Sequence, residues 1–95
     1  MKRAFWTPDA KRDLSRIDDY FAESDHEFAD RIGRLAISTA RFLAENPYIG
    51  PVIEPGSSRK WPVRKTPYLL IYRPVRGGVE ILRVRHAHED WKPSL

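Results

Sequence analysis

The sequence predicts a small α+β domain in which an N-terminal strand and an antiparallel two-helix hairpin precede a three-stranded antiparallel sheet. Three observations lead to this prediction. The first half contains two stretches of apolar residues at helical spacing, the middle is rich in proline and glycine, and the second half contains three short segments rich in β-branched and aromatic residues. Because 95 residues suffice for only one hydrophobic core, residues 1–95 are expected to form a single domain.

The first half opens with a predicted strand at residues 3–6, which gives way to a helix at Thr7 and Pro8. Threonine can cap a helix, and proline suits its first position. An apolar stripe of about three turns then follows, formed by Ala10, Leu14, Ile17, Tyr20 and Phe21. Most charged residues of this segment, Asp13 included, are expected on the opposite, solvent-facing side.

A second helix is predicted to begin at Ser24, because Ser24 and Glu27 match the Ser-x-x-Glu capping box. Its apolar stripe comprises Phe28, Ala29, Ile32, Leu35, Ala36, Thr39, Phe42 and Leu43. The helix should end at Asn46, since Pro47 disfavours a helical conformation in the residue before it. The short gap between the two helices implies an antiparallel hairpin.

The second half is predicted to form the main sheet. Residues 47–58 are rich in turn-forming residues and are interpreted as a crossing loop. Three strands are then expected, at residues 60–64, 68–74 and 79–86. Gly77 and Gly78 mark a hairpin turn, and Pro67 and Pro74 limit the middle strand. If both helices cover one face of this sheet, the other face is open, and function is expected there.

Charge and composition narrow the function classes. Residues 1–50 hold eight basic and nine acidic residues, a balance of −1, whereas residues 51–95 hold nine and four, a balance of +5. The C-terminal half therefore suits an acidic partner, either a nucleic acid or an acidic protein. Cysteine is absent, which excludes disulfides and cysteine nucleophiles. No apolar run approaches the ~18 residues of a membrane span, so a cytoplasmic protein is expected.

Four potential metal ligands lie close together in the sequence at the end of the last predicted strand: His86, His88, Glu89 and Asp90. No third ligand has a convincing spacing, and Arg83 and Arg85 would repel a cation. We therefore expect no metal and no cofactor. Nucleophile-elbow, phosphate-loop and dinucleotide-binding motifs are absent from the sequence, which argues against the corresponding enzyme classes.

A cluster of basic and aromatic residues remains as the candidate binding surface: Arg59, Lys60, Trp61, Arg64, Lys65, Tyr68, Tyr72, Arg73, Arg83, Arg85, His86 and Trp91. Guanidinium groups bind phosphates, and aromatic rings stack on bases, so such a cluster can hold RNA or DNA. The alternative is structural. Trp61, Tyr68 and Tyr72 are also typical core residues of strands, and Arg73 and Arg83 can pair across strands with Glu80.

Several short motifs stand in a characteristic order along the chain. They are Ala10-x-x-x-Leu14-x-x-Ile17-x-x-Tyr20, Asn46-Pro47-x-x-Gly50, a distant arginine at Arg59, Pro67-Tyr68-x-x-Ile71-Tyr72-Arg73, and Val79-Glu80-Ile81-Leu82-Arg83-Val84-Arg85-His86. In this order and spacing they resemble the RelE/ParE superfamily of bacterial toxins over nearly the whole chain. The resemblance implies a helical hairpin on an antiparallel sheet. It also implies a hetero-oligomer with a ParD-like or RelB-like antitoxin encoded beside the toxin.

The superfamily has two branches: RelE-like members cut messenger RNA in the ribosome, and ParE-like members inhibit DNA gyrase. After His86 the chain continues Ala87-His88-Glu89-Asp90-Trp91, without the C-terminal tyrosine typical of many ribosome-dependent members. The acidic residue of the alternative Glu-Arg-His set is also missing before Tyr68 and Arg73. The ending and the Tyr-x-x-x-Tyr-Arg strand look more like the ParE branch and its plasmid-stabilisation relatives.

Three hypotheses follow. In the first, the chain is a ParE-like toxin that poisons gyrase through a surface made of Arg59, Trp61, Arg64, Tyr72, Arg73, Arg83, Arg85 and His86. In the second, it is a RelE-like endoribonuclease with His86 as acid or base and with Arg59, Arg73 and Arg83 stabilising the transition state. In the third, it is a basic binding module without toxicity. In the toxin hypotheses, the antitoxin is expected to lay an amphipathic helix or strand on exposed apolar surface between helix and sheet, with its acidic residues facing the basic C-terminal half.

Overall fold

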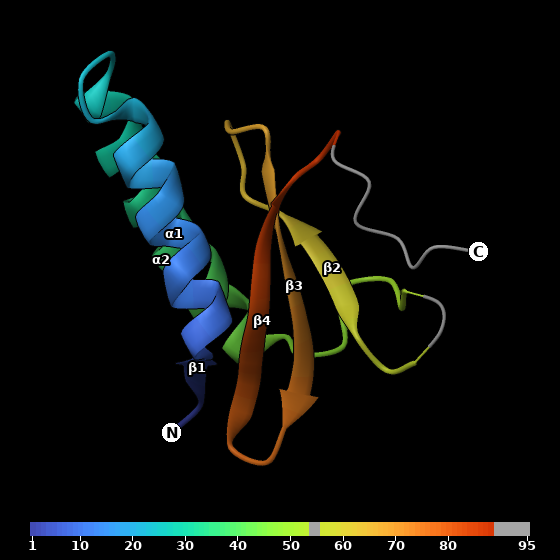
Figure 1. Cartoon of the computed structure of the whole chain (residues 1–95). Helices are drawn as coiled ribbons and strands as arrows, with labels where there is room; N and C mark the ends of the chain where they lie inside the picture. The colour runs from blue at the N-terminus through green and yellow to red at the C-terminus, as the bar shows by residue number, and fades with distance from the viewer. Residues whose placement is uncertain (54–55, 89–95) are drawn as a thin grey trace.

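The computed structural model describes residues 1–53 and 56–88. Its elements are β1 (Arg3–Trp6), α1 (Pro8–Phe21), α2 (His26–Glu45), β2 (Arg59–Pro62), β3 (Tyr68–Val75) and β4 (Gly78–His86). The predicted order of strand, two helices and three strands is confirmed, and with it the α+β class. Figure 1 shows the helical hairpin beside the strands, with β4 near the centre of the molecule. Within the described residues, neither helix combines the length and apolar character needed to cross a membrane.

The strands form one sheet in the order β1-β4-β3-β2. The predicted antiparallel sheet of three strands is present, since β3 pairs antiparallel with both β2 and β4. β1 adds a fourth strand, whose pairing the sequence had left open, and it runs parallel to β4 from Arg3 opposite Gly78 to Trp6 opposite Ile81. A parallel pair needs a long connection between its strands, and the helical hairpin and two further strands supply it here.

The helix starts are set by side-chain oxygens. Thr7 Oγ1 accepts a hydrogen bond from the N–H of Ala10 at 3.1 Å and donates to the carbonyl oxygen of Leu82 at 3.1 Å, so the cap also ties α1 to β4. α2 begins one residue later than a Ser24 cap would give. Its N-cap is Asp25, whose carboxylate accepts from the N–H of Phe28 at 3.1 Å. The predicted capping box is therefore wrong; the aspartate also carries the negative charge that a helix N-terminus favours.

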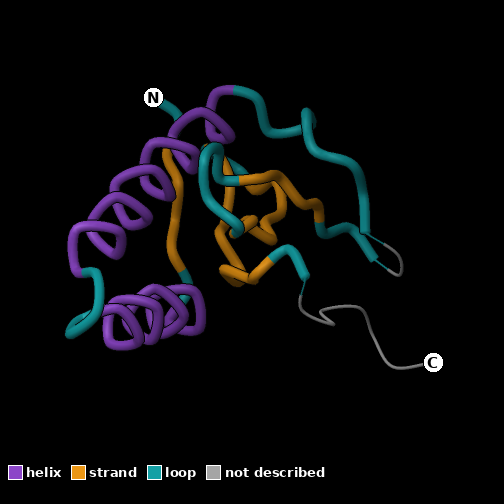
Figure 2. Tube along the Cα trace, turned by 90° about the horizontal axis from the view of Figure 1, so that it is seen from above, coloured by secondary structure: helices purple, strands orange, loops and turns teal. Residues whose placement is uncertain are grey.

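Small side chains let α2 approach the sheet closely. Ala36, Ala40 and Ala44 recur every four residues, lie on one face of the helix and are buried. They belong to one core cluster with five fully buried side chains from outside the helix: Tyr72, Leu70, Ile81, Val63 and Val79. Figure 2 shows both helices to one side of the strands, as predicted. We call this side of the sheet the helix-covered face and the other the open face.

The apolar stripes overestimate burial near the helix ends. Tyr20, in the last turn of α1, is 78% exposed, and Phe42 of α2 is 43% exposed. Figure 1 shows the far end of the hairpin, where α1 ends, leaning away from the strands. A helical stripe gives the direction in which a side chain points, but not whether the sheet reaches that far.

Candidate functional site

Arg59 fastens a loop to the sheet. Its Nη1 donates to the carbonyl oxygens of Tyr48, at 3.1 Å, and Gly50, at 2.6 Å, and its guanidinium lies 5.2 Å from the centroid of the Tyr48 ring. The N–H of Gly50 in turn donates to Tyr72 Oη at 3.0 Å. A Cβ at Gly50 would lie 2.4 Å from the carbonyl oxygen of Lys60, so this close approach requires glycine.

Two further candidate arginines form ion pairs. Arg73 Nε lies 2.7 Å from Glu80 Oε1, directly across the strands, which confirms the structural alternative for this residue. Arg83 pairs with Asp13 of α1 instead of Glu80. Its Nε and Nη2 donate to the two carboxylate oxygens at 2.8 and 2.9 Å, a bidentate geometry.

The residues proposed for a nuclease site are His86, Arg59, Arg73 and Arg83, and they project from both faces of the sheet. Residues directly opposite on neighbouring antiparallel strands share a face, whereas successive residues in one strand alternate. Arg59 lies opposite Tyr72, and His86 lies opposite Tyr68, on the helix-covered face. Arg73 follows Tyr72 and therefore points to the open face. Arg83 is instead drawn toward α1, where it pairs with Asp13. The four side chains do not converge on one point.

Two aromatic candidates are structural. The ring of Trp61, which is half-buried, lies 6.0 Å from that of Phe42 on α2. Tyr72 is fully buried. Burial raises the pKa of the Tyr72 phenol above 10.0, although the hydrogen bond from Gly50 and the charge of Arg59 act in the opposite direction. The expectation that Tyr72 contacts a target is wrong, because its side chain does not reach the surface.

The last part of the candidate cluster lies at the end of β4. The imidazole rings of His86 and His88 are 5.5 Å apart, and His86 Nδ1 accepts from the N–H of His88 at 3.2 Å. Glu89, Asp90 and Trp91 lie outside the described residues. Within residues 1–53 and 56–88 there is no group of three metal-ligating side chains.

A groove between α1 and the ends of β3 and β4 brings several candidates together. We call it the α1–β4 groove; a hollow of about 520 Å³ there is lined by Arg16, Ile17, Tyr20, Phe21, Pro67, Tyr68 and His86. Tyr68 and His86 meet edge to face, with ring centroids 5.3 Å apart. Arg16, Ile17 and Tyr68 also line an adjoining hollow that reaches Arg83 and Arg85. The groove therefore has an apolar, aromatic end and a basic end.

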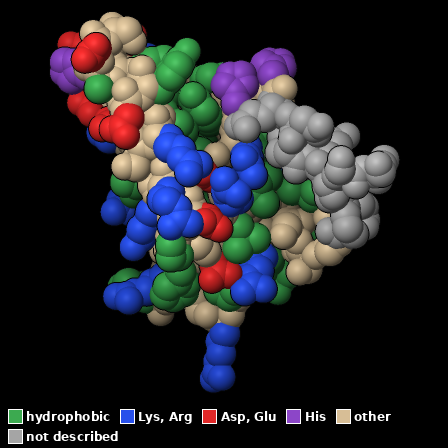
Figure 3. All heavy atoms as spheres, viewed as in Figure 1, with side chains coloured by type: hydrophobic (Ala, Val, Ile, Leu, Met, Phe, Trp, Pro, Cys, Tyr) green, Lys and Arg blue, Asp and Glu red, His purple; other side chains and the backbone are tan. Residues whose placement is uncertain are grey.

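Figure 3 shows the same division on the surface: apolar side chains and imidazoles lie at one end of the region between α1 and the strands, and Lys and Arg side chains gather below them. Of the predicted cluster, Tyr68, Arg83, Arg85 and His86 belong to this groove. Arg64 and Lys65 are exposed in the turn between β2 and β3 and do not line it. The contributions of Arg16, Tyr20 and Phe21 were not predicted, because the helical stripe placed both aromatic residues in the core.

Asp13 is a further residue whose role the sequence did not predict. It is 7% exposed rather than solvent-facing, and its Oδ2 accepts from the N–H of Val84 at 2.9 Å in addition to the pair with Arg83. Burial alone would raise the pKa of Asp13. The hydrogen bonds from Arg83 and Val84, together with the charges of Arg83 and Arg85, outweigh burial and hold the pKa below the ordinary value of 3.8.

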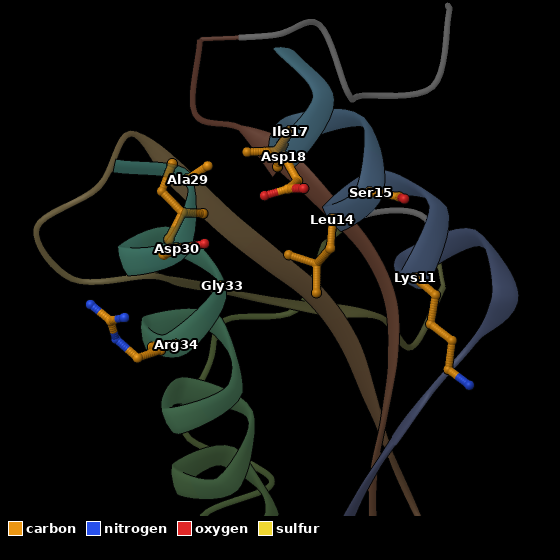
Figure 4. Close-up of a pocket in the computed structure, with 10 residues that line it drawn as sticks. Lys11, Leu14, Ser15, Ile17, Asp18, Ala29, Asp30, Gly33 and Arg34 are labelled. Carbon is orange, nitrogen blue, oxygen red and sulfur yellow. The ribbon is translucent and has the colours of Figure 1, made fainter. Parts of the chain in front are cut away.

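A third hollow, of about 400 Å³, lies between the two helices (Figure 4). Leu14 and Ile17 reach into it, while Lys11 and Arg34 extend outward at its rim. Its lining holds equal numbers of acidic and basic residues, so the hollow favours neither an anionic nor a cationic ligand. Its lining residues are Lys11, Leu14, Ser15, Ile17, Asp18, Ala29, Asp30, Ile32, Gly33 and Arg34.

Replacing Gly33 in this hollow with alanine is expected to raise the free energy of unfolding by about 0.5–1 kcal/mol, because glycine is unfavourable inside a helix. A Cβ at this position meets no atom within 4 Å, so the gain is not offset by a clash. Urea denaturation followed by circular dichroism measures the change. A loss of stability would contradict the open space that the structure shows at Gly33.

Comparison with known proteins places this fold in a family. Residues 4–91 match the family model of the ParE toxin of the type II toxin-antitoxin system parDE. The chain is 37% identical over 94 residues to Y4kP of Sinorhizobium fredii, a protein inferred to be a toxin. The match covers 99% of this chain and 97% of Y4kP. A solved structure of the chromosomal ParDE system from P. aeruginosa has the same fold, with a TM-score of 0.74 and 22% identity over 90% of this chain and 96% of the other. The chain therefore belongs to the ParE toxin family of type II toxin-antitoxin systems.

Proposed function

We propose that the chain is a growth-inhibiting toxin that poisons DNA gyrase and is neutralised by an antitoxin encoded beside it. Membership in the ParE family supports the toxin role. The choice of a protein target over RNA rests on one observation: the arginines that a nuclease would use are hydrogen-bonded to other groups of the same chain.

Cleavage of RNA by its own 2′-hydroxyl needs cations over the developing phosphorane charge and an acid and a base beside it. Arg59 is bonded to loop carbonyls, Arg73 to Glu80, and Arg83 to Asp13. Arg59 and Arg73 also point to opposite faces of the sheet. A phosphate would have to displace these partners, and the carboxylates of Glu80 and Asp13 would repel it. This arrangement favours binding of a protein over catalysis.

The α1–β4 groove is the surface proposed for the antitoxin. Its aromatic end offers Tyr20, Tyr68 and His86 to an apolar side chain of an amphipathic segment, and Arg16 and Arg85 at its basic end suit the carboxylates of an acidic protein. An exposed apolar patch that is bordered by charged side chains is typical of a site where another protein docks. The acidic helix or strand expected from the sequence fits this groove.

The target is tested by expressing the chain from a tightly controlled promoter, with and without the neighbouring reading frame. Messenger RNA integrity and gyrase supercoiling are followed in parallel. Growth arrest with intact messages and blocked supercoiling is expected, with rescue by the neighbouring frame. Rapid ribosome-dependent cleavage with normal supercoiling would overturn the proposal in favour of the nuclease, and unimpaired growth would favour a binding module without toxicity.

The groove is tested by the charge reversal Arg16→Glu, which is expected to weaken antitoxin binding about tenfold by opposing its carboxylates. Lys11→Glu makes a similar charge reversal on the same helix, but Lys11 lies at the rim of the hollow between the helices and outside the α1–β4 groove, so binding should stay within about twofold. Calorimetric titration of each purified variant with the antitoxin gives the comparison. Equal weakening by both substitutions would show only a dependence on net charge and would place the antitoxin elsewhere.

A further inference from the structure

Among the residues that the structure describes, no strand pairs with the outer side of β1, so this edge of the sheet is open. β1 is the terminal strand in the sheet order, and Figure 1 shows it on the outer side of β4. The N–H of Arg3 donates to the carbonyl oxygen of Gly77, just before β4, at 2.9 Å, and the N–H of Thr7 donates to that of Ile81 in β4 at 3.1 Å. Because alternate residues of a strand direct their backbone groups to opposite sides, those of Ala4 and Trp6 point away from β4, toward the open edge.

A groove runs along this edge between β1 and α2. We call it the β1 edge groove; its volume is about 600 Å³, and it is lined by Met1, Lys2, Arg3, Ala4, Phe5, Trp6, Ile37, Arg41, Ala44 and Glu45. Large apolar side chains are exposed on both elements: Phe5 is 44% exposed and Ile37 is 43% exposed. The side chains of Ala4 and Trp6 pack against the core, which anchors β1 beside this groove. None of these residues lines the α1–β4 groove.

The charges of the groove select the kind of partner. Lys2, Arg3 and Arg41 are exposed along it, against the single carboxylate of Glu45. Pairing of β1 with the β1 strand of a second copy would bring these basic side chains together, which is unfavourable. A segment that carries carboxylates would instead place them beside three cations.

We propose that the free edge of β1 binds an extended, acidic segment of a protein partner, which adds to the sheet as a fifth strand. Backbone hydrogen bonds to Ala4 and Trp6 supply affinity, and alternate side chains of the segment contact Ile37 on one side and Phe5 on the other. Carboxylates beside Arg41 and Lys2 supply selectivity. This inference does not depend on gyrase as the target, since it concerns a different surface.

The probe is a synthetic eight-residue peptide that alternates valine and glutamate, compared with one that alternates valine and lysine. Amide hydrogen exchange of the full chain is followed by NMR. In the free chain, the Phe5 and Thr7 amides are expected to be protected and the Ala4 and Trp6 amides to exchange faster. The acidic peptide should slow exchange at Ala4 and Trp6 about tenfold or more, and the lysine peptide should leave it unchanged.

Three variants refine the test. Ala4→Pro removes an outward N–H without removing a bond to β4, and proline is tolerated on edge strands, so it should weaken peptide binding about tenfold while the fold is kept. Arg41→Glu should weaken it about fivefold through charge. Arg34→Glu is the matched control, since it makes the same change on α2 outside the groove, and its effect should stay within about twofold.

Unchanged exchange at Ala4 and Trp6 on peptide addition would overturn the proposal, and so would equal effects of Arg41→Glu and Arg34→Glu. These two results stand even if the proline variant fails to fold. If protection at Ala4 and Trp6 rose with protein concentration alone, the edge would belong to a second copy of the chain, which would also contradict the proposal.

Discussion

Replacing Asp13 with alanine is expected to lower the free energy of unfolding by about 3 kcal/mol. The carboxylate accepts three hydrogen bonds, two from Arg83 and one from the N–H of Val84. Its removal deletes all three of these hydrogen bonds, including the one to the buried N–H of Val84. Because the Arg83 side chain is 31% exposed, water recovers part of the loss, and the effect should lie at the lower end of the range for broken buried ion pairs.

Asp18→Ala is the matched control for this experiment. It is the same substitution on the same helix, but Asp18 is exposed, so the free energy of unfolding should change by no more than about 0.5 kcal/mol. Chemical denaturation of both variants at neutral pH measures the difference. A similar, small effect of the two substitutions would mean that the Asp13 ion pair contributes little net stability.

The same carboxylate makes the stability of the protein dependent on pH. The pKa of Asp13 is lower in the folded chain than the ordinary value of 3.8, so the unfolded chain binds a proton more readily. The stabilisation is therefore fully present above about pH 5 and is lost as pH falls through 3.8 toward the folded pKa. In Asp13→Asn this part of the acid dependence should be missing. Denaturation of both proteins between pH 3 and 6 tests it, and parallel curves would contradict the lowered pKa.

Local signals in the sequence were sufficient for the element order. Thr7 and Pro8 fix the start of α1, and the paired glycines at 77 and 78 mark the β3–β4 turn. β3 extends one residue beyond its predicted end, through Pro74 to Val75. β2 pairs only as far as Tyr72, so at Pro74 β3 is itself an edge strand, where proline is tolerated. Such signals involve only a few neighbouring residues, so they can be recognised without knowledge of the tertiary structure.

The candidate site depends on contacts between segments that lie far apart in the sequence, and most of these contacts could not be predicted from the sequence. Asp13 faces the sheet because β1 ends at Trp6, which leaves the N–H of Val84 in β4 without a strand beside it, and α1 supplies a carboxylate instead. Helical periodicity contains no information on where a neighbouring strand stops. Likewise, the sequence places Arg59 in a cluster of basic and aromatic residues, but its carbonyl partners approach it only when the loop folds back on β2.

The point where β1 joins β4 should be the most sensitive to a single added methyl group. Gly78→Ala is expected to lower the free energy of unfolding by roughly 4 kcal/mol, the sum of backbone strain and overpacking. The φ angle of Gly78 is +148°, and a Cβ there would lie 1.8 Å from the carbonyl oxygen of Arg3. The oxygen belongs to the backbone and the backbone of residue 78 fixes the position of Cβ, so no side-chain rotation relieves the clash, and β1 must shift away from β4.

Gly77→Ala separates the two causes. Gly77 also has a positive φ, of +86°, but a Cβ there meets nothing within 4 Å. Only conformational strain applies, and the loss should be about 1 kcal/mol. Urea denaturation gives both free energies, and NMR amide exchange at Phe5 and Thr7 should show β1 detached in Gly78→Ala alone. Equal losses in the two variants would mean that backbone conformation, rather than the approach of Arg3, requires glycine here, and that β1 is held less closely than the structure indicates.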